Sequence, residues 1–181
     1  MGRRPTSQGT LAMPVFVVLL RAVNVGGTGK LPMGDLKRLC EKAGFRNIRT
    51  YIASGNVVAE RDGAEAKAKV ALEAELKAYA GKPVGVIVRT AAEMAAVVAS
   101  NPFPDRPASR TVAIFLDHAP PPDALKDVKG QANEEVRPGA REIYVHYPDG
   151  IGRSKLRIPA ADDGTARNMN TVAKLASMAA E

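Results

Sequence analysis

The sequence contains few of the residue types on which many functional sites depend. It has no tryptophan, and aromatic residues make up 4% of its 181 residues. It has one cysteine, Cys40, and two histidines, His118 and His146. A single cysteine excludes an intramolecular disulfide and fits a reducing cytoplasm. The histidines lack the spacing of zinc ligands, so we expect no metal site and no cofactor. The scarcity of aromatics leaves few side chains for stacking on nucleobases.

The sequence also lacks a long apolar run. The longest candidate, Val15–Leu20, is far too short to span a bilayer and is followed by Arg21. Residues 1–12 are mostly polar and include Arg3 and Arg4. We expect them to form a flexible N-terminal extension rather than a signal peptide. These features predict a cytoplasmic protein without membrane contact.

The remaining composition is that of a basic globular protein. Apolar residues make up 45% and charged residues 25%, and the net charge is +7. Residues 1–60 hold nine Lys/Arg and three Asp/Glu, so most of the excess lies in the first third. A basic region attracts anionic partners, which are nucleic acids or phosphorylated small molecules. The alternative is a charged surface that serves solubility alone.

The first half has the element order of a ferredoxin-like domain. The β-branched run Val15–Leu20 predicts a buried strand, and Cys40 falls on the apolar face of the helix that follows. Ser54-Gly55-Asn56 predicts a hairpin turn. The order βαββαβ is the ferredoxin-like pattern. The predicted elements are strands over residues 15–20, 48–53, 57–59 and 84–89 and helices over 32–43 and 64–80.

The second half predicts a similar unit with a less regular end. Thr90 and Glu93 have the spacing of a capping box and predict a short helix after them. His146 is out of phase with the apolar face of its strand, so we expect it to be exposed. Leu156–Ile158 is the candidate for the closing strand. The other predicted elements are strands over residues 111–116, 135–137 and 142–147 and helices over 122–129 and 168–180. The fold class is therefore α+β, with two ferredoxin-like sandwich domains in tandem, 13–90 and 91–181.

Three stretches have the composition of anion-binding turns. The first, residues 21–30, is rich in glycine and resembles a phosphate loop, but Asn24 and Leu31 occupy positions where a Walker A motif needs glycine and a hydroxyl. Glycines and a following helix N-terminus still favour an anion. The alternative is a strand-to-helix turn that needs glycine only for its backbone.

The second stretch is Gly152-Arg153-Ser154-Lys155, where two cations flank a hydroxyl. The third begins at Arg167, and its Asn168 or Asn170 could equally cap the last helix. We hypothesise that the three stretches converge on one cleft between the domains. The candidate binding residues are Arg21, Asn24, Gly26, Gly27, Lys30, Ser54, Asn56, Arg153, Ser154, Lys155, Arg167, Asn168 and Asn170.

These motifs, with others along the chain, closely resemble the bacterial family called domain of unknown function (DUF) 1697. The family's biochemical function is not established, so the resemblance implies a pair of ferredoxin-like domains and no activity. Met169 stands where the family usually has an aromatic residue, and Ala22 where it usually has glycine. The matching segments are Leu19-Leu20-Arg21, Asn24-Val25-Gly26-Gly27, Leu31-Pro32-Met33, Arg49-Thr50-Tyr51-Ile52, Ser54-Gly55-Asn56-Val57-Val58, Asn101-Pro102-Phe103, Gly150 to Leu156, and Thr165 to Leu175.

Three functions remain open from the sequence. The leading hypothesis is an anion-binding protein that contacts phosphates rather than reading bases, because exposed aromatic pairs are lacking. The second is an enzyme on a nucleotide or phosphorylated metabolite, with Lys30 or Lys155 stabilising charge and Asp149 or Asp35 as base. The third is a structural or interaction module whose motifs lock the domains together. Buried and paired cations would favour the structural module, and cations that line an open cleft would favour binding. A carboxylate or histidine within reach of them would favour the enzyme.

Overall fold

The computed structural model describes residues 13–21, 31–52 and 55–181. Within these ranges the protein is a mixed α/β structure with two four-stranded antiparallel sheets and four α-helices. The strands of the first sheet lie in the order β2-β3-β1-β4. Its elements are β1 (Val15–Leu20), α1 (Met33–Lys42), β2 (Arg46–Tyr51), β3 (Asn56–Glu60), α2 (Glu65–Ala80) and β4 (Val86–Thr90).

The second sheet has the equivalent strand order, β6-β7-β5-β8, but its helices α3 and α4 come before and after its strands in the sequence. Its elements are α3 (Ala91–Ala99), β5 (Thr111–Phe115), β6 (Glu135–Pro138), β7 (Glu142–His146), β8 (Thr165–Asn168) and α4 (Met169–Ala180). Three short 3₁₀ turns connect them, η1 (Ala108–Arg110), η2 (Ile151–Arg153) and η3 (Pro159–Ala161). Thr90 and Glu93 form the predicted capping box at the start of α3.

Two predicted elements of the second half are wrong. The helix predicted over residues 122–129 is replaced by consecutive turns over residues 122–127, and Lys129 forms a β-bridge, because so short a segment beginning in a proline run cannot stabilise helical hydrogen bonds by itself. The closing strand is β8, not Leu156–Ile158. It pairs with β5, from Phe115↔Thr165 to Val112↔Asn168. Its sequence Thr-Ala-Arg-Asn has no strand-like apolar pattern, so only pairing within the sheet defines it.

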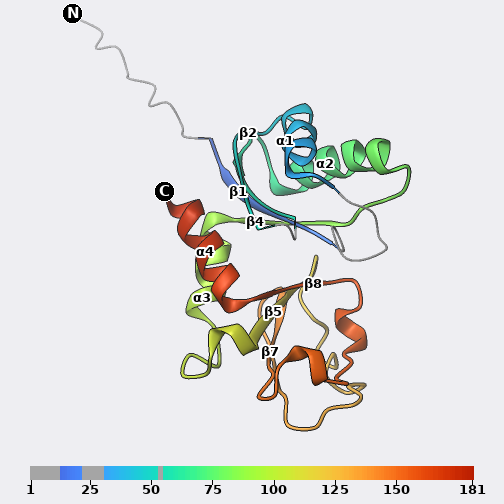
Figure 1. The fold of residues 1–181 in the computed structure, drawn as a ribbon, viewed down its shortest axis with the longest axis vertical. Helices are drawn as coiled ribbons and strands as arrows, with labels where there is room; N and C mark the ends of the chain where they lie inside the picture. The colour runs from blue at the N-terminus through green and yellow to red at the C-terminus, as the bar shows by residue number, and fades with distance from the viewer. Residues whose placement is uncertain (1–12, 22–30, 53–54) are drawn as a thin grey trace, which may run out of the picture.

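The two sheets share one buried core. Helices α1 and α2 cover one face of the first sheet, and α3 and α4 lie side by side against its other face and against the second sheet (Figure 1). Alternate residues of β1 therefore point into different cores, Val18 toward α1 and α2 and Val17 toward α3 and α4. This two-sided burial explains why β1 is continuously apolar. Loops cover the second sheet's remaining face, where Ile143 and Val145 lie.

Buried arginine at the junction of the two sheets reinforces this packing. Arg89 is 1% exposed and donates hydrogen bonds to Leu116 O and to Arg141 O at 2.9 Å. Arg141 in turn pairs with Glu65 at 3.1 Å and with Glu93 at 3.0 Å. The first and second halves are therefore joined by charge-assisted hydrogen bonds as well as by apolar contact.

The exposed position predicted for His146 is wrong. His146 is 3% exposed, its Nδ1 lies 3.1 Å from Thr111 Oγ1, and its ring lies 6.0 Å from that of Phe103. The alternation in β7 was correctly recognised, since Ile143 and Val145 share one face. The opposite face is also buried, because Tyr144 packs in the core between the two sheets and Phe103 lies beside His146.

Burial of His146 predicts a pH-dependent stability. Desolvation, with smaller contributions from Arg106 and Arg110, lowers the pKa of His146, although Glu135 opposes the shift. The folded state therefore binds fewer protons than the unfolded state. The contribution of neutral His146 to the free energy of unfolding is fully present above the unfolded pKa of about 6.5, and it is lost as the pH falls below that value. We expect the free energy of unfolding, measured with urea, to decrease between about pH 7.5 and about pH 5.5.

The matched variants are His146→Gln and His118→Gln, since His118 is exposed. The first should lose most of this decrease and the second should keep it. An unchanged pH dependence in His146→Gln would contradict the assignment.

Candidate functional site

Arg167, from the third predicted stretch, is a buried link between the halves. It is 9% exposed, and its Nε donates to Asn56 Oδ1 at 2.7 Å while Nη2 donates to Leu20 O at 2.9 Å. Its Nη1 donates to Thr165 Oγ1 at 2.6 Å. Burial lowers the pKa of Arg167 to about 10, which still leaves it charged at neutral pH. These contacts match the structural role that the sequence left open for the predicted cations.

The asparagines of the predicted set divide in the same way. Asn56 is fully buried, and its Nδ2 donates to Tyr51 O at 2.9 Å. Asn168 caps α4, where its Oδ1 accepts from Thr171 N–H at 2.9 Å. Asn170 is exposed on the first turn of α4. The predicted residues Asn24, Gly26, Gly27, Lys30 and Ser54 lie outside the described residues.

Arg21 is half exposed and also contacts the other half of the chain. It donates to Asp162 O, and its Nη1 lies 3.5 Å from Asp163 Oδ1. The acidic turn before β8 therefore partners Arg21. The beginning of the first stretch and the third stretch do meet, because both reach the end of β1.

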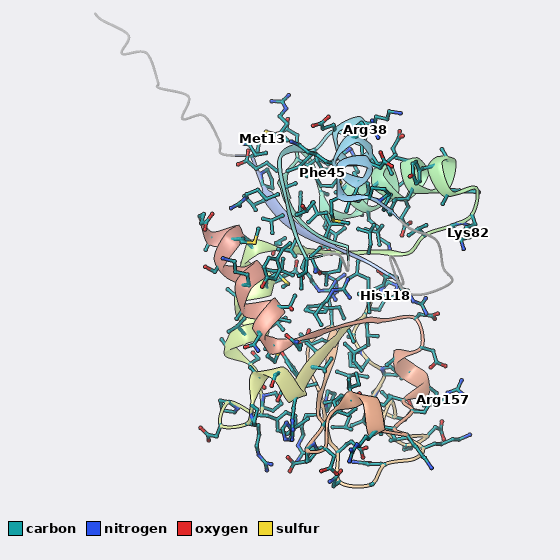
Figure 2. The ribbon with its side chains drawn as sticks, in the orientation of Figure 1. Met13, Arg38, Phe45, Lys82, His118 and Arg157 are labelled. Atoms are coloured by element: carbon teal, nitrogen blue, oxygen red, sulfur yellow. The ribbon has the colours of Figure 1, made fainter. Side chains whose placement is uncertain are left out.

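Arg153 and Lys155, from the second stretch, are exposed on the surface of the second half. Side-chain exposure alternates along this segment. Arg153, Lys155 and Arg157 are exposed, and Leu156 and Ile158 pack against the core of the second sheet. We call Arg153, Lys155, Arg157 and the neighbouring Lys129 the cation row. Figure 2 shows Arg157 at the outer rim of the second half.

The cation row stands on a well-supported backbone. Lys129 and Arg157 form an antiparallel bridge, with N–H to O distances of 2.9 and 2.8 Å. Residues directly opposite in such a pair share a face, so two like charges lie side by side, which is unfavourable. Within the part of the chain that the structure describes, none of the four cations lies within 4.0 Å of a carboxylate oxygen. A bound anion would relieve this repulsion.

Arg157 and Lys129 are not among the binding residues predicted from the sequence. The signal for Arg157 was present, because cations recur at every second position from Arg153 and apolar residues fill the positions after Lys155. That alternation is typical of an extended segment with one buried face. The position of Lys129 beside Arg157 depends on tertiary pairing.

A cavity of about 220 Å³ adjoins the cation row. Arg153, Ser154 and Lys155 form part of its wall, together with Asn133, Glu134, Tyr147 and Asp149. Ser154 Oγ donates to Glu134 Oε1 at 2.6 Å and accepts from Leu156 N–H at 3.1 Å. This hydrogen bond from Ser154 and another from Ala132 N–H lower the pKa of Glu134.

A larger cavity, of about 330 Å³, lies at the junction of the halves. Its charged groups already bind one another, as in the contacts of Arg141 with Glu65 and Glu93. Glu142 likewise accepts from Arg141 N–H at 3.0 Å and from Tyr144 OH at 3.0 Å. The charged groups of this cavity therefore already have partners within the protein, which explains their presence without a ligand.

Other chemistry has less support in the described ranges. Over residues 13–21, 31–52 and 55–181, the structure contains no group of three or more His, Cys, Asp or Glu side chains placed to hold a metal ion. Cys40 is buried in the first core, and burial raises the pKa of its thiol to about 12, so it belongs to the core as predicted. No helix in these ranges has the length and apolar character that a membrane span requires.

Fold and surface together define a mixed α/β protein with paired antiparallel sheets and an exposed row of cations. The family described as "Protein of unknown function (DUF1697)" matches residues 13–144, and the chain belongs to this family. The matched range ends before Arg153. A solved structure, that of the conserved bacterial protein SP0830 from Streptococcus pneumoniae, is similar to the chain with a TM-score of 0.77 and 20% sequence identity. The similarity covers 94% of this chain and 100% of that one, and it supports the fold alone. No curated protein matches the chain.

Substitution of Arg167 should reveal its structural role. Arg167→Met removes the donor to Leu20 O and Asn56 Oδ1, and a buried acceptor left unpaired costs about 1–3 kcal/mol. We expect the free energy of unfolding to fall by roughly 3 kcal/mol in urea denaturation. The exposed Arg153→Met should change it by less than about 0.5 kcal/mol. Equal effects of the two variants would show that Arg167 does not hold the junction.

Gly130 should be required for the backbone that carries the cation row. Its φ is +68°, and a Cβ there would collide with the carbonyl oxygen of Lys155. Gly81 has a similar φ of +73° with open space around it. Gly81→Ala should therefore cost about 1–2 kcal/mol from the left-handed backbone alone. Gly130→Ala should cost clearly more in the same denaturation experiment, and an equal loss would contradict the close approach.

Proposed function

We propose that this protein binds the sugar–phosphate backbone of a single-stranded nucleic acid through the cation row. The observation that carries the proposal is the row itself, in which exposed cations stand side by side without a carboxylate partner among the described residues. Their apolar neighbours Leu156 and Ile158 anchor the segment, so little ordering of the backbone is needed on binding. A preorganised row of positive charge favours a polyanion.

The shape of the row favours a chain of phosphates over a single one. Alternate residues of an extended segment lie about 6.6 Å apart, so Lys155 and Arg157 are separated by about this distance, and Arg153 lies at the end of η2 directly before them. Ser154 has extended backbone dihedrals, with φ −76° and ψ 138°. A small phosphorylated metabolite could contact only part of such a row, whereas successive phosphates of an extended strand could contact all of it.

The proposal retains part of the site predicted from the sequence. It keeps Arg153 and Lys155 and adds Arg157 and Lys129. Arg21 and Arg167 are not included, since their guanidinium groups contact the other half of the chain. A locking role fits these two arginines, and a binding role fits the exposed row.

An enzyme remains a second candidate because Asp149 and Lys155 line the same cavity. Glu134 is a poor general base there, since its lowered pKa leaves the carboxylate with little affinity for a proton. Cleavage of a bound oligonucleotide, followed by gel electrophoresis, would support this alternative and would be abolished by Asp149→Asn.

We also infer that residues 13–90 and 91–181 are two ferredoxin-like units. The order β2-β3-β1-β4, with a helix between β1 and β2 and another between β3 and β4, supports this for the first unit. The second has the equivalent strand order, but among its described residues no α-helix lies between β5 and β6, and only the 3₁₀ turns η2 and η3 lie between β7 and β8. A cytoplasmic location is part of the same proposal, in keeping with the single Cys40 and an intracellular polyanion.

The test is a fluorescence anisotropy titration with labelled RNA and DNA single strands of about 12 nucleotides. The variant Arg153→Ala/Lys155→Ala/Arg157→Ala should bind at least about tenfold more weakly than the wild type at low salt. The slope of log affinity against log salt concentration should also become shallower by about 2, because about 0.7 ion is released per phosphate contact on a single strand.

A matched control changes the net charge equally on the first half. Lys67, Lys77 and Lys82 are exposed, and Figure 2 shows Lys82 far from Arg157. Lys67→Ala/Lys77→Ala/Lys82→Ala should bind nearly as tightly as the wild type. Equal losses in both triple variants would reduce the effect to net charge and would reject the site. Absence of binding by the wild type at low salt would reject nucleic acid as the ligand.

A further inference from the structure

The cavity beside the cation row has the size and position to receive one nucleobase. At about 220 Å³ it is smaller than the roughly 300–1,000 Å³ typical of pockets for drug-sized ligands. Two members of the row, Arg153 and Lys155, line it directly. A nucleotide whose phosphate contacts these cations would therefore have its base within reach of the cavity.

Apart from the cations Arg153 and Lys155, the polar side chains that line the cavity are mainly acceptors. Asn133 Nδ2 donates to Asp149 Oδ2 at 2.8 Å, and the second oxygen of each side chain, Asn133 Oδ1 and Asp149 Oδ1, is a further acceptor. Asp149 and Asn133 are exposed, so both are accessible to a ligand. Glu134 adds negative charge, although its oxygens already accept from Ser154 and Ala132. Tyr147 is 8% exposed and contributes part of the wall.

The acceptors of Asp149 and Asn133 select among bases by the donors that each base presents. Guanine presents two adjacent donor positions, N1–H and the N2 amino group, on its Watson–Crick edge. Adenine and cytosine each present one amino group beside an acceptor, and uracil presents one N–H between two acceptors. A carboxylate can accept both guanine donors at once, whereas the other bases would place an acceptor against it.

We propose that this cavity binds one unpaired guanine of the nucleic acid whose backbone contacts the cation row. The inference depends on the proposed function, because the cations must hold the flanking phosphates. The base must be unpaired, since its Watson–Crick edge meets Asp149 and Asn133. Phosphate contacts then supply affinity, and the cavity supplies a preference at one position.

The experiment compares four labelled single strands of about 12 nucleotides that are uracil or thymine except for one central position, which is guanine, adenine, cytosine or the parent base. Anisotropy titrations at one salt concentration give the affinities. We expect the guanine strand to bind at least about fivefold more tightly than the parent strand, as expected for a bidentate contact to a base.

Asp149→Asn should abolish this preference without weakening the binding of the parent strand. It removes a negative charge beside the cation row, so affinity for the parent strand should stay equal or rise. Asn133→Ala, which removes the neighbour of Asp149, should also reduce the preference. Asp62→Asn is the matched control, since Asp62 is exposed on the first half, and it should keep the wild-type preference.

The possible outcomes separate the two proposals. Failure of the wild type to bind any strand would overturn both. Binding of all four strands with equal affinity would overturn the guanine site and leave the cation row intact. A guanine preference that persists in Asp149→Asn, or one that Asp62→Asn also removes, would likewise overturn the assignment to this cavity.

Discussion

The apolar core shared by the two sheets is the constraint on which the rest of the structure depends. Helices α3 and α4 fill the space between the sheets, so Val17 and Ile87 of the first sheet pack in one core with Phe115 and Tyr144 of the second. At about 25 cal/mol for each Å² of apolar surface buried, such a core is the main favourable contribution to folding. Separation of the two halves would therefore expose this shared core to solvent.

The cations divide between two roles because of this packing. Arg89 and Arg167 lie at the junction, where carbonyl oxygens of the other half accept their hydrogen bonds. Buried carbonyls need donors, and a guanidinium supplies several in fixed directions. Arg153, Lys155 and Arg157 lie beyond the junction, on a segment that is anchored by Leu156 and Ile158. Their like charges remain unneutralised by the described carboxylates, which is the arrangement expected of a surface that meets an anion.

Sequence reasoning predicted well where a local pattern has one physical meaning. The β-branched run of β1, the capping box of α3 and the buried face of Cys40 were all correctly assigned, because periodicity and capping are local signals. It was wrong for β8, which forms only because it pairs with β5. It was also wrong for the helix over residues 122–129, where the helix propensity is weak and the segment begins in a proline run. It was wrong for His146 because alternation shows that a strand has two faces and does not show what covers each one.

The sequence by itself determined the mixed α/β class, most of the element boundaries and the residues from which a site could be built. Tertiary structure alone decided which of the motif cations are buried. Arg167 and Arg153 look equivalent in the sequence, since each is followed by a small polar residue and lies near a glycine or a turn. One meets Leu20 O and Asn56 across more than a hundred residues, and the other meets solvent. Whether a side chain is buried depends on contacts with segments far away in the sequence, and a local sequence pattern contains no information about those contacts.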